Sequence, residues 1–289
     1  MRETSVGTGS SQQGIQKGPG KGGRVLASHA VLSLLALLMI LPFVWMVLAS
    51  FKTRAEVEQI NPVPGVWHPE NYLRVFEQIP FAKYYFNSVF VAAWVTTLQC
   101  LTSSMAAYAF ARIRWVGRDA VFRLYLTTLM IPGVVTMIPN FSLMVRLHLL
   151  DSYVGLIVPA AFSAFGTFLL RQFMLTIPAS LDEAAGMDGA THWQIFWDVI
   201  FPLARPGVIT LAVFTFMGTY GSFTWPLIMI KSEGLRTLPI GMMFFDSIYG
   251  KQTELIMAAS VMNIVPLIIL FVCTQKFLVQ GIQLGAVKG

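Results

Sequence analysis

The polar residues that could do chemistry in this chain are few, and four of its 14 acidic residues fall in one stretch. Within residues 182–206 (DEAAGMDGATHWQIFWDVIFPLARP) these are Asp182, Glu183, Asp188 and Asp198. A carboxylate works as a general acid or base only when it reaches a reacting group. Nothing in the sequence pairs these residues with a base or a nucleophile. The chain also has no G-x-S-x-G elbow and no Cys/His metal spacing. We therefore expect no enzyme activity, no metal site and no cofactor in this chain.

A second polar stretch lies inside an apolar run. The sequence TYGSFTWPL at 219–227 offers aromatic rings and hydroxyl groups on Tyr220, Ser222, Phe223, Thr224 and Trp225. Flat rings and a few polar groups are what a sugar site requires. Asn140 and Asn263 are further polar candidates for such a path. The alternative is helix packing, in which Gly218 and Gly221 allow close approach.

The composition indicates which elements must position these residues. Of 289 residues, 55% are hydrophobic and 12% are charged, whereas soluble domains carry about 25% charged residues. A helix that spans a bilayer needs about 20 mostly apolar residues. Six runs without Asp, Glu, Lys or Arg meet or approach that length: 25–51, 84–111, 124–145, 152–170, 206–230 and 255–275. We predict an all-α integral membrane protein with six transmembrane helices.

These spans divide the chain. We expect a disordered cytoplasmic tail at 1–24, a first transmembrane helix at 25–51, an external loop at 52–83, a core at 84–280 that includes a cytoplasmic loop at 178–206, and a cytoplasmic tail at 281–289. Lys and Arg are more numerous on the side that holds both termini, and Arg112, Arg114, Arg118 and Arg123 cluster there. Because positive residues favour the cytoplasmic side, both termini are predicted to be cytoplasmic.

The six runs lack ionisable residues deep in the bilayer. His29 is the one candidate, and it lies near an end of the first run. Pumps and ion-coupled carriers carry intramembrane carboxylates, His or Arg. The composition therefore leaves passive conduction, or transport that takes its energy from another protein.

The acidic stretch is predicted to begin with a short capped helix. Ser180 followed by Glu183 matches a capping box, and Gly189 stands where a helix ends in the left-handed conformation. A slim helix of this kind can enter a groove on another protein. The alternative is an ordinary helical loop without a docking role.

A second helix should follow. Thr191 and Gln194 form another capping box, and Pro202 is expected to end the helix. An apolar stripe at i, i+3, i+4, i+7 is expected to pack on the ends of the transmembrane helices; it consists of Trp193, Phe196, Trp197 and Ile200.

The same stretch resembles the loop motif of the membrane subunits of binding-protein-dependent ABC importers. The matching positions are Glu183, Ala184, Ala185, Asp188, Gly189, Val199 and Pro202. Phe201 stands where the family usually has Leu. Further matches, similar to the carbohydrate branch and its maltose-permease type, are SFK at 50–52, PENY at 69–72, NS at 87–88, AYAFAR at 107–112, LLRQFM at 169–174 and GAVKG at 285–289. Tyr220 and Gly221 depart from the Trp-Asn pair that the family commonly carries.

The resemblance implies a type I ABC importer permease fold and a permease subunit that carries a sugar across the cytoplasmic membrane. Its partners would be a second homologous permease subunit, two ABC ATPase subunits and an extracytoplasmic sugar-binding protein. The segment Glu183–Gly189 would enter a cleft of the ATPase, which uses the ATP. The chain would lie in membrane lipid, in the cell (inner) membrane of a bacterium or archaeon, with no nucleic-acid partner.

Three alternatives remain open at this point. A permease of the same architecture could import glycerol 3-phosphate or another polyol derivative, although a buried Arg would then be expected. A passive solute channel would need no ATPase. A membrane-embedded enzyme would need a clustered nucleophile, acid pair or metal site, which the sequence lacks.

Overall fold

The computed structural model describes residues 21–59, 61–247 and 250–286. The chain divides into two compact units, Met1–Met46 and Val47–Gly289. Of the tail expected at 1–24, residues 1–20 lie outside the described residues, while Lys21–Arg24 already belong to a helix. The tail expected at 281–289 is likewise helical as far as Ala286, and its last three residues are not described.

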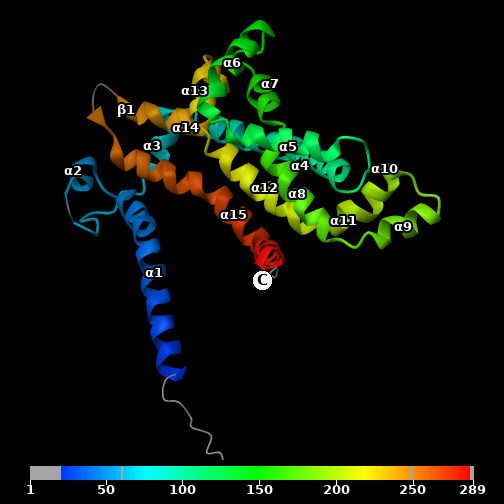
Figure 1. The fold of residues 1–289 in the computed structure, drawn as a ribbon. Helices are drawn as coiled ribbons and strands as arrows, with labels where there is room; N and C mark the ends of the chain where they lie inside the picture. The colour runs from blue at the N-terminus through cyan, green and yellow to red at the C-terminus, as the bar shows by residue number, and fades with distance from the viewer. Residues whose placement is uncertain (1–20, 60, 248–249, 287–289) are drawn as a thin grey trace, which may run out of the picture. The chain divides into compact units, whose positions relative to one another are not determined.

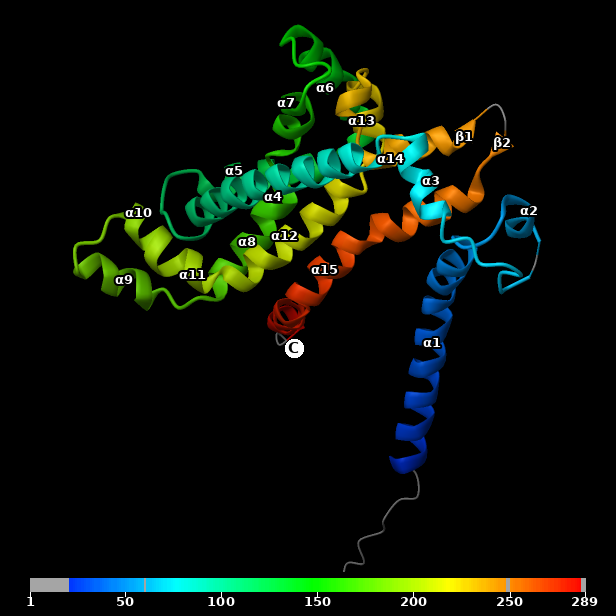
Figure 2. The same ribbon diagram turned by 180° about the vertical axis from the view of Figure 1, so that it is seen from behind.

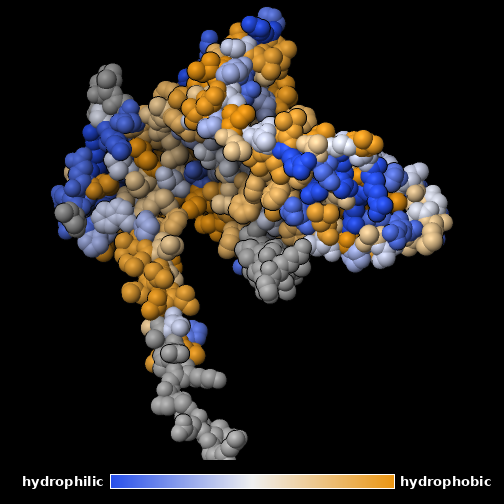
Figure 3. Space-filling view, in the orientation of Figure 1, coloured by the Kyte–Doolittle hydropathy of each residue, from blue (hydrophilic) through white to orange (hydrophobic). Residues whose placement is uncertain are grey.

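The first unit contains most of helix α1 (Lys21–Ala49). Its segment Ser28–Ala49 is long and apolar enough to cross a membrane, and none of that window is buried. Leucine, isoleucine and valine side chains with half or more of their surface exposed account for this, and they appear as a hydrophobic column in Figure 3. The helix ends two residues before the expected Phe51, because Phe51 and Lys52 form a turn on Leu48 and Ala49.

The second unit is a bundle of helices (Figures 1 and 2). Helix α4 (Phe81–Ala111) packs along α8 (Ala164–Thr176) and α12 (Arg205–Tyr220), and α12 packs along α15 (Thr253–Ala286). The other α-helices are α2 (Arg54–Val57), α3 (Asn71–Gln78), α5 (Arg118–Thr127), α6 (Gly133–Arg146), α7 (Tyr153–Ile157), α9 (Ser180–Met187), α10 (His192–Gln194), α11 (Phe201–Leu203), α13 (Thr224–Met229) and α14 (Leu238–Gly241).

Short elements connect these helices. They are the 3₁₀ turns η1 (Thr128–Met130), η2 (Val158–Ala160), η4 (Glu233–Leu235) and η5 (Met242–Phe245), the π-helical segment η3 (Ile195–Ile200), and the antiparallel strands β1 (Asp246–Ser247) and β2 (Gly250–Lys251). The fold is therefore helical, as predicted.

Several of the expected spans are broken. Within the described residues, three helices are long and apolar enough to cross a membrane, and up to six spans result if each bent pair counts as one. The bends are 98° between 118–130 and 133–146, 45° between 153–160 and 164–176, and 75° between 192–203 and 205–220. Pro132 is the N-cap residue of α6, directly after the first bend, and Pro159 lies in the turn η2 at the second bend. Proline favours bends at these places because it lacks the N–H group of a helical hydrogen bond. The run 206–230 stops being helical at Gly221 and resumes at Thr224.

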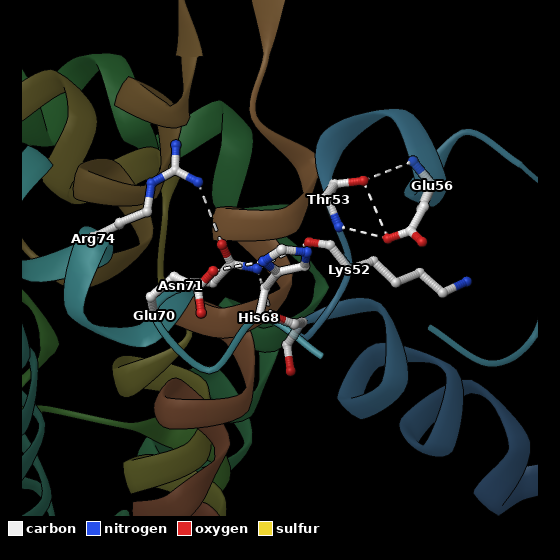
Figure 4. Close-up of polar contacts among 8 residues, drawn as sticks. Lys52, Thr53, Glu56, His68, Glu70, Asn71 and Arg74 are labelled. Atoms are coloured by element: carbon white, nitrogen blue, oxygen red, sulfur yellow. Dashed lines mark hydrogen bonds and ion pairs between the residues drawn. The ribbon is translucent and has the colours of Figure 1, made fainter. Parts of the chain in front are cut away.

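Polar contacts hold the segment after α1 in place (Figure 4). Asn71, which is buried, donates from Nδ2 to the carbonyls of Ser50 (3.0 Å) and Lys52 (2.9 Å). Arg74 in turn donates to the Asn71 side-chain oxygen at 3.3 Å. Thr53 and Glu56 form a capping box on α2. Asn71, from the PENY match, thus fixes the backbone of residues 50–52 against the start of α3.

The ends of the second unit differ in character. One end carries α9 and α10, and the opposite end carries α3, β1 and β2 (Figures 1 and 2). Hydrophilic surface gathers over the region of α5 and α10 (Figure 3). A core cluster at the α9–α11 end packs α4, α8 and α12 against the loop 178–206, which connects α8 to α12. Its buried members are Cys100, Ala107, Tyr108, Leu170, Met174, Ile195, Phe196, Ile200, Ala204 and Leu211.

Candidate coupling loop and central cavity

Helix α9 begins differently from the prediction. The carbonyl of Ala179 accepts hydrogen bonds from the N–H groups of Asp182 (3.0 Å) and Glu183 (3.2 Å), so Ala179 is the N-cap residue. Ser180 is already helical, and a hydroxyl inside the first turn cannot cap the turn. The predicted capping box of Ser180 and Glu183 is therefore wrong. Glu183 is instead an exposed residue of the first turn of α9.

The end of α9 is confirmed at Gly189. The N–H of Gly189 bonds to the carbonyl of Gly186 (3.1 Å), and that of Ala190 bonds to the carbonyl of Ala185 (3.0 Å). These two bonds are a Schellman motif. It requires the left-handed backbone that Gly189 adopts, with φ of +83°. The turn after α9 is therefore a defined joint.

The second capping box is also confirmed. The Thr191 hydroxyl accepts from the N–H of Gln194 (3.3 Å), and the Gln194 side chain accepts from the N–H of Thr191 (2.8 Å). Two consecutive helix ends in this loop are thus tied by local hydrogen bonds. Both motifs were readable because each depends on a few neighbouring residues.

Three of the four residues in the expected stripe pack in the core. Phe196 and Ile200 are buried and Trp197 packs against the core cluster, but Trp193 is 58% exposed. Trp193 lies in α10, before the π-helical segment η3 begins at Ile195. Within η3, where hydrogen bonds span five residues rather than four, Ile195 is buried as well. Phe196 packs against Tyr108 of α4 with ring centroids 5.3 Å apart.

Pro202 does not end the second helix where expected. The helical segment 192–203 continues one residue past Pro202 and ends at Leu203. The chain instead bends by 75° between Leu203 and Arg205. Ala204, fully buried at this bend, belongs to the core cluster. The loop therefore passes directly into α12.

An ion pair joins α9 to the bundle. Arg112, the C-cap residue of α4, places Nη1 3.1 Å from Oδ2 of Asp182. Arg112 Nη2 also donates to the carbonyls of Met174 and Ile177, both at 2.7 Å. Burial raises the pKa of the Asp182 carboxyl, and the Arg112 charge opposes that rise. The Arg112 side chain thus joins the end of α4 to two other segments, α9 and the end of α8.

The opposite face of α9 is uncovered. Glu183, Ala184, Met187 and Asp188 are exposed, and Met187 has 83% of its surface accessible. Ala185 packs against the core cluster. Helix α9 therefore has an inner side fixed to the bundle, and an outer side that combines carboxylates with a free methionine.

The bundle holds a cavity of about 270 Å³. Three predicted path residues line it: Asn140 from α6, Ser222 and Trp225. The Trp225 ring nitrogen donates to the carbonyl of Gly155 at 3.2 Å, which fixes the indole. No charged side chain lines the cavity among the described residues; the other polar members are Ser88, Thr219 and Thr237.

Four predicted path residues lie elsewhere. Tyr220 is 2% exposed, and its hydroxyl donates to the carbonyl of Asn263 at 3.0 Å. This contact joins α12 to α15 and is helix packing. Phe223 and Thr224 are exposed beside the cavity, outside its lining. The stretch 219–227 does not present all its aromatic and hydroxyl groups to one cavity, because the helix breaks after Tyr220 and resumes at Thr224.

Sequence reasoning missed several residues at both places. Arg112 was used only to orient the chain, although it belongs to the AYAFAR match. Asp182 was noted as polar without a partner. Ser88 and Thr237 gave no signal, because they come from α4 and the segment before α14 and meet only in the fold.

Comparison with known proteins settles the family. Residues 99–282, more than half of the chain, match the binding-protein-dependent transport system inner membrane component family. The chain belongs to this family. The match includes the whole of the loop 178–206, the core cluster beneath it, α12 and most of α15. A member of this transport family is a multi-pass membrane permease, and its transport depends on a binding protein, as the family name states.

Individual relatives agree. The chain is similar to the arabinooligosaccharides transport system permease protein AraQ of Halalkalibacterium halodurans, at 34% identity over 88% of this chain and 93% of that protein. The lactose transport system permease protein LacG of Rhizobium radiobacter is 33% identical, with 91% and 96% covered. A solved bacterial ABC transporter involved in the import of the acidic polysaccharide alginate matches at a TM-score of 0.80 and 25% identity, covering 90% of this chain and 98% of that one. The permease fold of ABC importers is thereby established for this chain.

Proposed function

We propose that this permease carries a neutral sugar or short oligosaccharide inward across the cell membrane of a bacterium or archaeon. Two of its relatives are named for arabinooligosaccharides and lactose. The cavity lining offers hydroxyl and amide groups with one indole ring, and no charge among the described residues. Such a lining suits a neutral polyol, because an anionic cargo would need a compensating cation.

The energy comes from a partner in this proposal. The outer side of α9 enters a cleft of an ABC ATPase subunit, in the helix-in-groove mode. Glu183, Asp188 and Met187 make contact there, the small Ala184 side chain between them allows close approach, and Gly189 ends the helix and reverses the direction of the chain. A second permease subunit, a second ATPase and an external sugar-binding protein complete the importer.

The observation that carries the proposal is the construction of α9. Its inner side is held to the bundle by Arg112 and Ala185, while its outer side is exposed. A helix built only to close a loop would not need a fixed inner side and a mixed acidic and apolar outer side.

The topology follows from the same assignment. Six spans place both termini and the loop 178–206 in the cytoplasm, and the segment 52–83 outside. The helical segment 192–203 belongs to that loop, so the 75° bend before Arg205 marks the entry into the fifth span. The permease core comprises residues 84–280.

The test is reconstitution of the chain with its partner subunits and binding protein in vesicles. We expect ATP-dependent uptake of labelled arabino-oligosaccharide or lactose. Uptake of glycerol 3-phosphate, or of an acidic oligosaccharide in preference to neutral ones, would overturn the cargo assignment. Equilibration of solute without ATP or an ATPase would instead mark a passive channel.

A further inference from the structure

Arg112 is the point at which α9 meets the bundle. It ends α4, and its guanidinium bonds to Asp182 of α9 and to two carbonyls at the end of α8. The sequence separation between Arg112 and Asp182 is 70 residues, so the contact belongs to the tertiary fold. No other ion pair in the described part of the chain ties α9 to another element.

The pair is largely shielded from water. The side chain of Arg112 is 8% exposed and that of Asp182 is 21% exposed. Asp182 Oδ1 and Arg112 Nε are buried without a hydrogen-bond partner among the described residues. A shielded charge that loses its partner is strongly unfavourable. Separating Arg112 from Asp182 would therefore cost free energy, and a displacement of α9 that keeps the ion pair must also displace Arg112 and the ends of α4 and α8.

The turn of α4 before Arg112 holds the second short helix. The Tyr108 hydroxyl lies 3.4 Å from Nδ1 of His192, the first residue of α10, and its ring packs on Phe196. One helical turn of α4 thus contacts both arms of the loop. These contacts lie on opposite sides of the Gly189 joint.

We propose that Arg112 is a positioning residue, through which displacement of α9 is passed to α4 and α8. This inference rests on the proposed docking of α9 on an ATPase. Arginine is required because its planar fork bonds to a carboxylate and to two carbonyls simultaneously. Lysine keeps the charge as a single point without that geometry. Glu183 and Met187 receive the partner, and Arg112 carries the motion onward.

The experiment uses the reconstituted complex and three variants: Arg112→Lys, Asp182→Asn and the double variant. The readout is the number of ATP molecules hydrolysed per sugar transported. Coupling between sites typically corresponds to about 5- to 150-fold, so we expect each single variant to raise this ratio at least about fivefold while the ATPase subunits still co-purify. The double variant should be no worse than the worse single variant, because both changes break one contact.

Arg123→Lys is the matched control. Arg123 belongs to the same basic cluster, is exposed, and forms no hydrogen bond or ion pair in the described structure. It should keep the wild-type ratio.

Several results would overturn the inference. One is a wild-type ratio in both single variants, and another is additive effects in the double variant. A third is loss of assembly in both variants while Arg123→Lys assembles, since Arg112 would then be a folding contact only. A wild-type complex that fails to bind an ATPase would instead refute the proposed function.

Discussion

Gly189 has a φ of +83°, and open space surrounds the position of a Cβ atom built on it. Replacing it with alanine would therefore cause no clash, but the left-handed backbone costs a residue with a Cβ about 1–2 kcal/mol. We expect Gly189→Ala to loosen the turn after α9. The protein should still insert in the membrane, while ATP-driven uptake falls and the loop becomes easier to cleave with protease.

Gly186 offers a control three residues away. It also has open space at its Cβ position, but its φ is not in the left-handed range, and it lies inside α9. Gly186→Ala should leave protease sensitivity unchanged or lower it, because alanine favours a helix by roughly 1 kcal/mol over glycine. Equal sensitivity of the two variants would contradict the role given to the Gly189 joint.

Thr237 is 4% exposed, lines the central cavity and has a hydroxyl without a partner among the described residues. A cargo hydroxyl would satisfy it. Thr237→Val keeps the shape and removes the hydroxyl, so uptake should fall by roughly fivefold, the equivalent of one hydrogen bond of about 1 kcal/mol.

Thr96 on α4 is the matched control for this change. Its hydroxyl is also buried and without a partner in the described structure, but it does not line the cavity. Thr96→Val should transport normally. Similar uptake in the two variants, measured at equal expression, would remove Thr237 from the path.

Asp151 joins two elements. It lies between α6 and α7 with a φ of +52°, and its carboxylate accepts from the N–H groups of Lys231 and Ser232, both at 2.9 Å, and from the Ser232 hydroxyl. The Ser232 hydroxyl and N–H bonds, and the Lys231 N–H, lower the pKa of Asp151. The contact thus holds the α6–α7 turn against the segment after α13.

The lowered pKa of Asp151 makes the stability of the fold depend on pH. A carboxylate with a depressed folded-state pKa stabilises the protein above its unfolded pKa, here near 3.8, and this is lost as the pH falls through the folded value. Asp151→Asn, which tolerates the same backbone, should lower the melting temperature at pH 7. The difference from wild type should disappear at pH values below the folded pKa. A difference that persists there would assign the effect to shape rather than charge.

Local patterns predicted some elements and failed at others for a physical reason. The Thr191 cap and the Gly189 turn depend on bonds within five residues, and both were correct. The Ser180 cap failed because the helix begins one residue earlier, and the N–H of Glu183 already bonds to the carbonyl of Ala179. The stripe failed only at Trp193, which is exposed in α10, while its other three members pack in the core cluster.

At the scale of the whole chain, the membrane topology can be tested by labelling. Met187 is 83% exposed on α9, and Val63 is 57% exposed in the predicted external segment. In a chain with Cys273 replaced by alanine and no ATPase present, we expect a membrane-impermeant maleimide to label Val63→Cys in intact cells. Met187→Cys should be labelled only after the membrane is opened. Labelling of Met187→Cys in intact cells would reverse the proposed orientation.

Composition and local spacing alone were enough for the membrane character, the helical class and the Gly189 and Thr191 helix ends in the loop 178–206, because each depends on the frequency or adjacency of residues. The ABC importer family was also readable, since its motif lies within 20 residues. The contacts of Arg112 with Asp182, and the cavity with Thr237 in its lining, were decided only by the tertiary structure. They bring together residues that are far apart in the chain, and their pairing depends on where α4, α8 and α12 bend and pack.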